Sequence, residues 1–98
     1  MKIAISRAAL DDLAAIWICG AERWSVDQAE RYTTRMMLGI SGLAENPHMA
    51  PLVIELASNM RRLVSGAHVV FYRVGDKVVE VVRVLHQRMD AADRLEGA

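Results

Sequence analysis

The feature that most constrains this chain is a change in hydrophobic period near residue 60. Before that point apolar residues recur at the three- and four-residue spacing of an amphipathic helix. After it they alternate or run together and are largely β-branched, as in strands. This order indicates an α+β fold, in which an antiparallel helical hairpin packs on a small antiparallel sheet of three to four strands. A short apolar–polar alternation at Lys2–Ile5 predicts a further strand at the N-terminus.

Capping signals delimit the two helices. Ser6 can accept a hydrogen bond at the start of the first helix, and Ser25 with Gln28 three residues later has the form of a capping box. The second helix is predicted to end at Asn46-Pro47, because proline cannot continue the hydrogen-bond ladder. The predicted inward stripes are Leu10, Leu13, Ala14, Trp17, Ala21 and Trp24 on the first helix, and Ala29, Tyr32, Met36, Ile40 and Leu43 on the second.

The strand region divides at two turn signals, Ser65-Gly66 and Gly75-Asp76. The predicted strands are Met60–Val64, His68–Val74 and Val78–Leu85. A two-residue turn at Gly75-Asp76 would pair His68 with Arg83 and leave both faces of the sheet largely apolar. Since one helical hairpin covers only one face, we expect a partner to cover the other.

The connection between the helices and the strands, residues 49–58, is strongly apolar and contains Leu52, Val53 and Ile54. It fits two interpretations. The segment is either a short extra turn packed on the core, or an exposed patch that receives a ligand chain. The sequence leaves both open.

Composition and charge limit the possible functions. The chain of 98 residues is long enough for one domain, residues 1–98, and its 53% apolar content supports a folded core. Twelve basic and twelve acidic residues give a formal net charge of zero, which argues against direct nucleic-acid binding. The single Cys19 excludes an internal disulfide and a multi-cysteine zinc site, so we expect neither a metal nor another cofactor. No apolar run reaches membrane-spanning length, and a cytoplasmic protein is expected.

Two tracts of the strand region have residue identities that neither periodicity nor composition requires. They are His68–Arg73 (His-Val-Val-Phe-Tyr-Arg) and Arg83–Asp90 (Arg-Val-Leu-His-Gln-Arg-Met-Asp). Weaker matches are Asp12-Leu13, Ile16-Trp17, Trp24, Ala29, Tyr32 and Arg61-Arg62. Together these residues resemble the ParE branch of the RelE/ParE toxin superfamily of bacterial type II toxin–antitoxin modules, over roughly residues 2 to 93. The chain departs from the family pattern after Pro47, where a glycine is usual and His48-Met49-Ala50 stands instead.

The resemblance implies a RelE/ParE-like fold and a toxin that inhibits DNA gyrase by binding, blocks replication and has no catalytic centre. It also implies a ParD-like antitoxin of the ribbon-helix-helix type, with which the chain forms a hetero-oligomer. We assign target binding to Arg83, His86, Arg88 and Met89, and antitoxin binding to Trp17, Trp24, Leu52 and Ile54. Replacing Arg83 or Arg88 by alanine is expected to abolish toxicity and to leave the stability of the fold nearly unchanged.

A RelE-like, ribosome-dependent mRNA endonuclease is the alternative function. In that case His86 would transfer protons, and Arg83 and Arg62 would bind the scissile phosphate. An interaction module without toxicity is a third class that the sequence leaves open. The other reactive side chains are His48, His68, Tyr72 and Cys19, and their spacing matches neither a metal site nor a nucleophile motif. The His68 ring is expected to form its hydrogen bond with a neighbouring backbone group. Cys19 is expected to be a small buried apolar residue.

Overall fold

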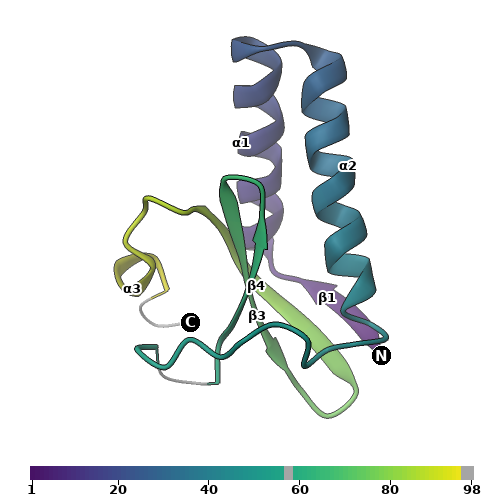
Figure 1. The fold of residues 1–98 in the computed structure, drawn as a ribbon, viewed down its shortest axis with the longest axis vertical. Coiled ribbons are helices and arrows are strands. Elements are labelled where there is room, and N and C mark those ends of the chain that lie inside the picture. Colours follow the sequence, from purple (N-terminus) through teal and green to yellow (C-terminus); the bar gives the residue numbers. More distant parts are fainter. Residues whose placement is uncertain (57–58, 96–98) are drawn as a thin grey trace.

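The computed structural model describes residues 1–56 and 59–95 of the chain. Its elements in chain order are β1 (Lys2–Ile5), α1 (Arg7–Arg23), α2 (Val26–Gly42), β2 (Arg61–Ser65), β3 (His68–Val74), β4 (Val78–His86) and α3 (Ala91–Arg94). α1 and α2 lie side by side as an antiparallel hairpin whose tip projects beyond the sheet (Figure 1). The α+β fold predicted from the change in period is confirmed. Within the described residues, no helix is both long and apolar enough to cross a membrane.

The sheet has the strand order β1-β4-β3-β2. The three C-terminal strands form the predicted antiparallel meander, but β1 pairs with β4 in parallel, so the sheet is mixed. β1 can take this place because the helical hairpin and the following segment carry the chain to β2 at the far edge, which leaves one side of β4 free. Figure 1 shows the first strand next to β4, the last one in sequence.

The predicted register between β3 and β4 is wrong, because the turn and a bulge both shift it. The Gly75 N–H donates to the Val78 carbonyl at 2.7 Å, which centres the turn one residue later than predicted and pairs Val74 with Val79. A bulge between Phe71 and Tyr72 adds one further residue to the shift. As a result, His68 pairs with His86 instead of Arg83.

The inward stripe of α1 differs in part from the predicted one, of which Leu13 packs on the core as expected. Ala9 is fully buried and Leu13 and Ile16 pack on the core, whereas Leu10 is exposed and Trp24 is 71% exposed. The small residue Gly20 lies on the same stripe, where a Cβ would stand 3.3 Å from that of Ala29 on α2. Close contact between the helices therefore selects the stripe with small residues, and Trp24 lies at the projecting tip of the hairpin, beyond the sheet.

The stripe of α2 is as predicted, although the helix ends earlier. Met36, Ile40 and Leu43 are fully buried in the cluster under the hairpin, which also contains Tyr72, Val79 and Val81 from the sheet. Ser25 caps the helix by accepting from the Gln28 N–H at 3.0 Å. The helix stops at Gly42 instead of Asn46, and two turns connect it to the following segment.

The second face of the sheet is covered by the chain itself, so the expectation that this face awaits a partner is wrong. The residues of this second cluster are Met60, Val69, Phe71, Val82, Leu85 and Leu95, with Val53, Leu56 and Ala91 packed against them. The apolar connection is packed on the core in part and exposed in part. Val53 and Leu56 pack inward, while Leu52 is exposed and Ile54 is 91% exposed. Residues 57–58 of this connection lie outside the described residues.

Candidate functional site

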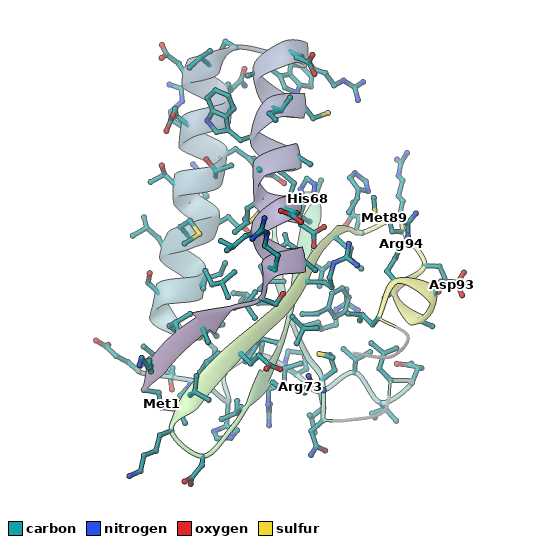
Figure 2. The ribbon with its side chains drawn as sticks, turned by 180° about the vertical axis from the view of Figure 1, so that it is seen from behind. Met1, His68, Arg73, Met89, Asp93 and Arg94 are labelled. Carbon is teal, nitrogen blue, oxygen red and sulfur yellow. The ribbon has the colours of Figure 1, made fainter. Side chains whose placement is uncertain are left out.

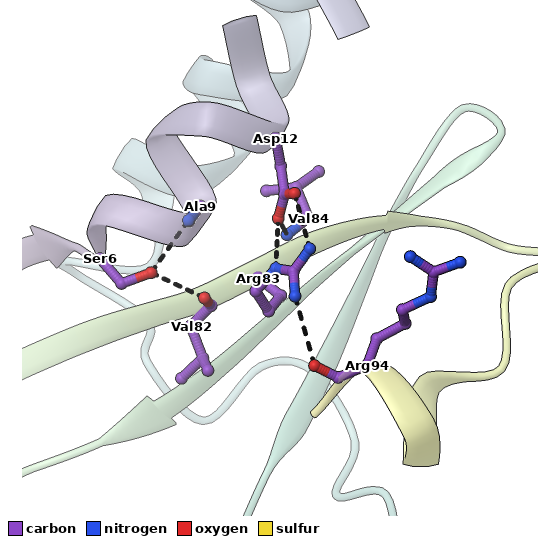
Figure 3. Close-up of polar contacts among 7 residues, drawn as sticks. All are labelled: Ser6, Ala9, Asp12, Val82, Arg83, Val84 and Arg94. Atoms are coloured by element: carbon purple, nitrogen blue, oxygen red, sulfur yellow. Dashed lines mark hydrogen bonds and ion pairs between the residues drawn. The ribbon is translucent and has the colours of Figure 1, made fainter. Parts of the chain in front are cut away.

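The free edge of β4 is completed by side chains from the start of α1. Pairing with β1 ends at Ile5 and Val81, so the next residues of β4 are paired with β3 on one side and have no strand on the other. The Ser6 hydroxyl donates to the Val82 carbonyl at 2.7 Å and also caps α1 by accepting from the Ala9 N–H (Figure 3). Further along α1, the Asp12 carboxylate accepts from the Val84 N–H at 2.9 Å. Helix α1 thereby replaces the missing strand along this edge.

Arg83 is held at this edge of β4 by a bidentate ion pair with Asp12. Its Nε and Nη2 donate to the two oxygens of Asp12 at 2.7 and 2.9 Å, and its Nη1 donates to the Arg94 carbonyl at 3.3 Å. The hydrogen bonds that Arg83 donates to the Asp12 carboxylate raise the pKa of Arg83. Figure 3 shows the guanidinium between α1 and the C-terminal helix α3. Arg83 therefore links three elements, and its removal should lower stability, contrary to the expectation from sequence.

A groove of about 490 Å³ lies between the helical hairpin, the β2–β3 turn and the end of β4. Ile16, Ala29 and the exposed Trp24 contribute apolar surface to it. Its titratable lining residues are Cys19, Arg23, Tyr32, His68 and His86. Carboxylates are absent from this lining, which consists of described residues only.

Tyr32, His68 and His86 form a connected cluster on the inner side of this groove. The Tyr32 hydroxyl lies 2.6 Å from His68 Nδ1 and accepts from the Ala67 N–H at 3.0 Å. The His68 ring packs edge-on against His86, with 5.3 Å between the ring centroids. Burial lowers the pKa of His68 below its usual 6.5, and the neighbouring His86 adds to this effect.

The β2–β3 turn is shaped around this cluster. Gly66 has a φ of +59°, and a Cβ at this position would lie 2.7 Å from the Tyr32 hydroxyl. The turn therefore requires glycine for its backbone conformation and for the space that Tyr32 occupies. Spacing along the sequence gave no signal for the cluster; only the correct register would have revealed it, by pairing His68 with His86.

Three of the four residues assigned to target binding lie together at one end of the sheet. His86 ends β4, and its Nδ1 accepts from the Arg88 N–H at 3.1 Å. Arg88 and Met89 follow in an exposed turn, which is closed by a hydrogen bond from the Met89 N–H to the His86 carbonyl. Figure 2 shows Met89 at the same end of the molecule as His68. Arg83 does not join this exposed turn, because Asp12 and Arg94 occupy its guanidinium.

The three residues that the nuclease alternative requires are not brought together. Arg62 and Arg83 lie in one row across the sheet, on either side of Phe71, which belongs to the second apolar cluster. His86 instead lines the groove under the helical hairpin, on the other face. Within the described residues, no three His, Cys, Asp or Glu side chains gather closely enough to hold a metal ion.

The residues assigned to antitoxin binding fall into separate places. Trp24 borders the groove at the tip of the hairpin, and Trp17 is half-buried between the helices with its Nε1 donating to Glu30 at 3.3 Å. Leu52 and Ile54 are exposed on the segment that covers the second face of the sheet. A single partner that contacts all of them has to extend along much of the molecule.

The remaining reactive side chains take structural or exposed positions. Tyr72 is fully buried, its hydroxyl donates to the Pro47 carbonyl at 2.8 Å, and burial raises its pKa. His48 is exposed in the turn that contains Pro47. Cys19 is exposed on α1, so the prediction of a buried cysteine is wrong; it faces the groove because the close contact at Gly20 sets the rotation of the helix.

Comparison with known proteins agrees with this architecture. The profile of the family described as "ParE toxin of type II toxin-antitoxin system, parDE" matches residues 3–91. Toxin ParE1 of Mycobacterium tuberculosis (strain H37Rv) is 45% identical over 87 residues, 88% of this chain and 89% of the relative. Toxin ParE1 of Caulobacter vibrioides is 45% identical over 91 residues, 93% and 94% of the two chains. The fold also matches a chain of the chromosomal ParDE TA system from P. aeruginosa, with a TM-score of 0.78, 17% identity, and coverage of 88% and 95%.

Proposed function

The chain belongs to the ParE family of toxins from type II toxin–antitoxin systems, and on that premise we propose that it inhibits DNA gyrase by binding, without a catalytic step. The observation that carries the proposal is the separation of the reactive side chains. His86 faces the hairpin, while Arg83 is neutralised by Asp12 and, with Arg62, belongs to the other face. A ribonuclease needs a proton-transfer group and a phosphate-binding group at one reacting centre, so this arrangement favours a protein that acts by binding. We propose the cytoplasm as the place where it acts.

The turn after β4 is the proposed contact with gyrase. Arg88 and Met89 are exposed, and the turn is anchored by β4 and by the hydrogen bonds of His86. Arginine and methionine are enriched in protein interfaces, and a turn held by a buried strand loses little entropy when it binds. Arg83 contributes by fixing the end of β4 against α1.

A supercoiling assay with purified gyrase tests the proposal, run beside primer extension on transcripts from cells that express the chain. We expect inhibited supercoiling, gyrase-dependent DNA breaks and intact transcripts. Arg88→Ala should abolish the inhibition without loss of thermal stability, and Arg7→Ala, which replaces an exposed arginine on α1, should not change it. Cleaved transcripts with unaffected supercoiling would establish the endonuclease function instead.

We further propose that a ParD-like antitoxin of the ribbon-helix-helix type neutralises the toxin in a hetero-oligomer. Two exposed apolar sites at Trp24 and at Leu52 with Ile54 favour a partner with an extended, partly disordered tail, because such a tail can reach both sites. Removal of the tail should abolish tight binding. A truncated antitoxin that still neutralised the toxin would disprove this mode of binding.

A further inference from the structure

We propose that the groove between the hairpin and the end of β4 is the docking site for an acidic and apolar segment of the antitoxin, which binds together with a proton. The inference rests on the proposed function, since the antitoxin is the partner it names. It goes further in assigning the site, the chemistry of the segment and the effect of pH.

The charge of the groove selects an anionic ligand. Its lining carries Arg23 and two imidazoles, and among these described lining residues there is no carboxylate. This is a local imbalance, because the whole chain has twelve basic and twelve acidic residues. A ligand carboxylate would therefore meet cationic or protonatable groups on the inner side and at the rim.

The apolar part of the groove selects a side chain beside that carboxylate. Ile16, Ala29 and Trp24 line the walls, and Trp24 leaves 71% of its surface exposed at the hairpin tip. A volume of about 490 Å³ accommodates a few side chains of one segment rather than the surface of a folded domain. An antitoxin tail that folds on binding fits such a groove better than a large, folded target protein does.

Binding here also explains how an antitoxin would block the toxin. His86 lines the groove and at the same time accepts the hydrogen bond from the Arg88 N–H that shapes the exposed turn. A segment seated on His86 would cover the turn or hold it in one conformation. The two functions are coupled because they share this one residue.

The proton sensitivity of the site is assigned to His68, which several titratable groups surround. Tyr32 approaches it from α2, His86 from β4, and Cys19 and Arg23 line the groove from α1. Without a ligand, burial and the neighbouring His86 disfavour the positively charged form of His68. A carboxylate in the groove favours the imidazolium form, so the complex takes up a proton and becomes more stable as the pH falls.

The test is calorimetric titration of the full-length chain with its full-length ParD-like antitoxin, between about pH 5.5 and pH 8. Titrations in two buffers of different ionisation enthalpy report the protons taken up. We expect net proton uptake and a dissociation constant about tenfold lower at the acidic end, the effect of one pKa unit. His68→Gln should remove this pH dependence, whereas His48→Gln, which replaces an exposed histidine outside the groove, should keep it.

A second pair of variants tests the charge at the rim. Arg23→Gln should weaken binding about two- to fivefold, the effect typical of an exposed charge pair, and Arg7→Gln at the other end of α1 should not. NMR titration of the histidine rings in the unmodified chain needs no variant to fold. It should show a higher pKa for His68 in the complex than in the free toxin.

The outcomes separate the inference from the function on which it rests. Tight binding without proton uptake, and with unchanged histidine titrations, would overturn the groove as the docking site while leaving the antitoxin as partner. Absence of any binding to the antitoxin would overturn both. If purified gyrase, titrated in the same way, shows the proton uptake and the antitoxin does not, the groove belongs to the target and the inference is wrong.

Discussion

The ion pair between Asp12 and Arg83 offers a quantitative test of how this fold is held together. Asp12→Ala removes the acceptors of three hydrogen bonds, two from the guanidinium and one from the Val84 N–H. Removing one partner of a fully buried ion pair costs about 3–5 kcal/mol. The Arg83 side chain keeps 24% of its surface exposed, so water can solvate part of the charge. We therefore expect a loss of about 2–3 kcal/mol in the free energy of unfolding.

Urea denaturation followed by circular dichroism measures this loss, and thermal unfolding should show a melting temperature lower by roughly 10–20 °C. Asp11→Ala is the matched control. Its carboxylate is 3.6 Å from Arg7 in a pair whose side chains are 89% and 72% exposed, so its removal should cost less than about 0.5 kcal/mol. The double variant with Arg83→Ala should recover part of the loss, because no unpaired cation remains.

If Asp12→Ala and Asp11→Ala destabilise the chain equally, the ion pair is no more than a surface contact, and Arg83 does not tie α1 to the end of β4. In that case Arg83 would again be free to act directly on the target, as the sequence suggested. Equal toxicity of the Asp12→Ala and unmodified proteins at a temperature where both are folded would lead to the same conclusion.

Gly66→Ala should destabilise the fold by about 2–4 kcal/mol, because φ is positive there and the new Cβ would displace the Tyr32 hydroxyl. Gly42→Ala is the control in the same denaturation assay. It should be neutral or slightly stabilising, because a Cβ at this position would meet nothing within 4 Å. Because the folded-state pKa of His68 is lowered, the unfolded chain binds more protons, and stability should be complete above about pH 6.5 and decline below it. A melting temperature that stays constant between pH 7.5 and pH 5, or that falls equally in His68→Gln, would contradict this. His86→Gln should remain toxic with intact transcripts in primer extension, whereas a nuclease should lose roughly 100-fold or more in rate.

Local signals in the sequence were sufficient for the order and type of the elements from β1 to β4, whereas the short helix α3 was not predicted. Ser6 and Ser25 cap the two helices as predicted, and the change from helical to strand periodicity places the sheet after residue 60. These features depend on residues a few positions apart, whose interactions are nearly the same in any fold. The family inferred from the two tracts of unusual identity, together with the weaker matches, is confirmed by the family profile over residues 3–91.

The arrangement of the candidate site depended on contacts between residues distant in sequence. Asp12 and Arg83 are 71 positions apart, and nothing in either local pattern indicates that they pair. The cluster of Tyr32, His68 and His86 forms only because a turn shifted by one residue and a bulge change the register of β4. Each such shift changes which side chains meet across the sheet, while the hydrophobic pattern remains compatible with several registers.

The same distinction holds for the surfaces. The sequence by itself determined that the sheet has two apolar faces, since strand alternation is a local property. Only the tertiary structure decided that the chain's own connection and C-terminal helix cover the second face, and that Trp24 stays exposed at the hairpin tip. Burial is a property of the space left between packed elements, and that space exists only once the elements have come together.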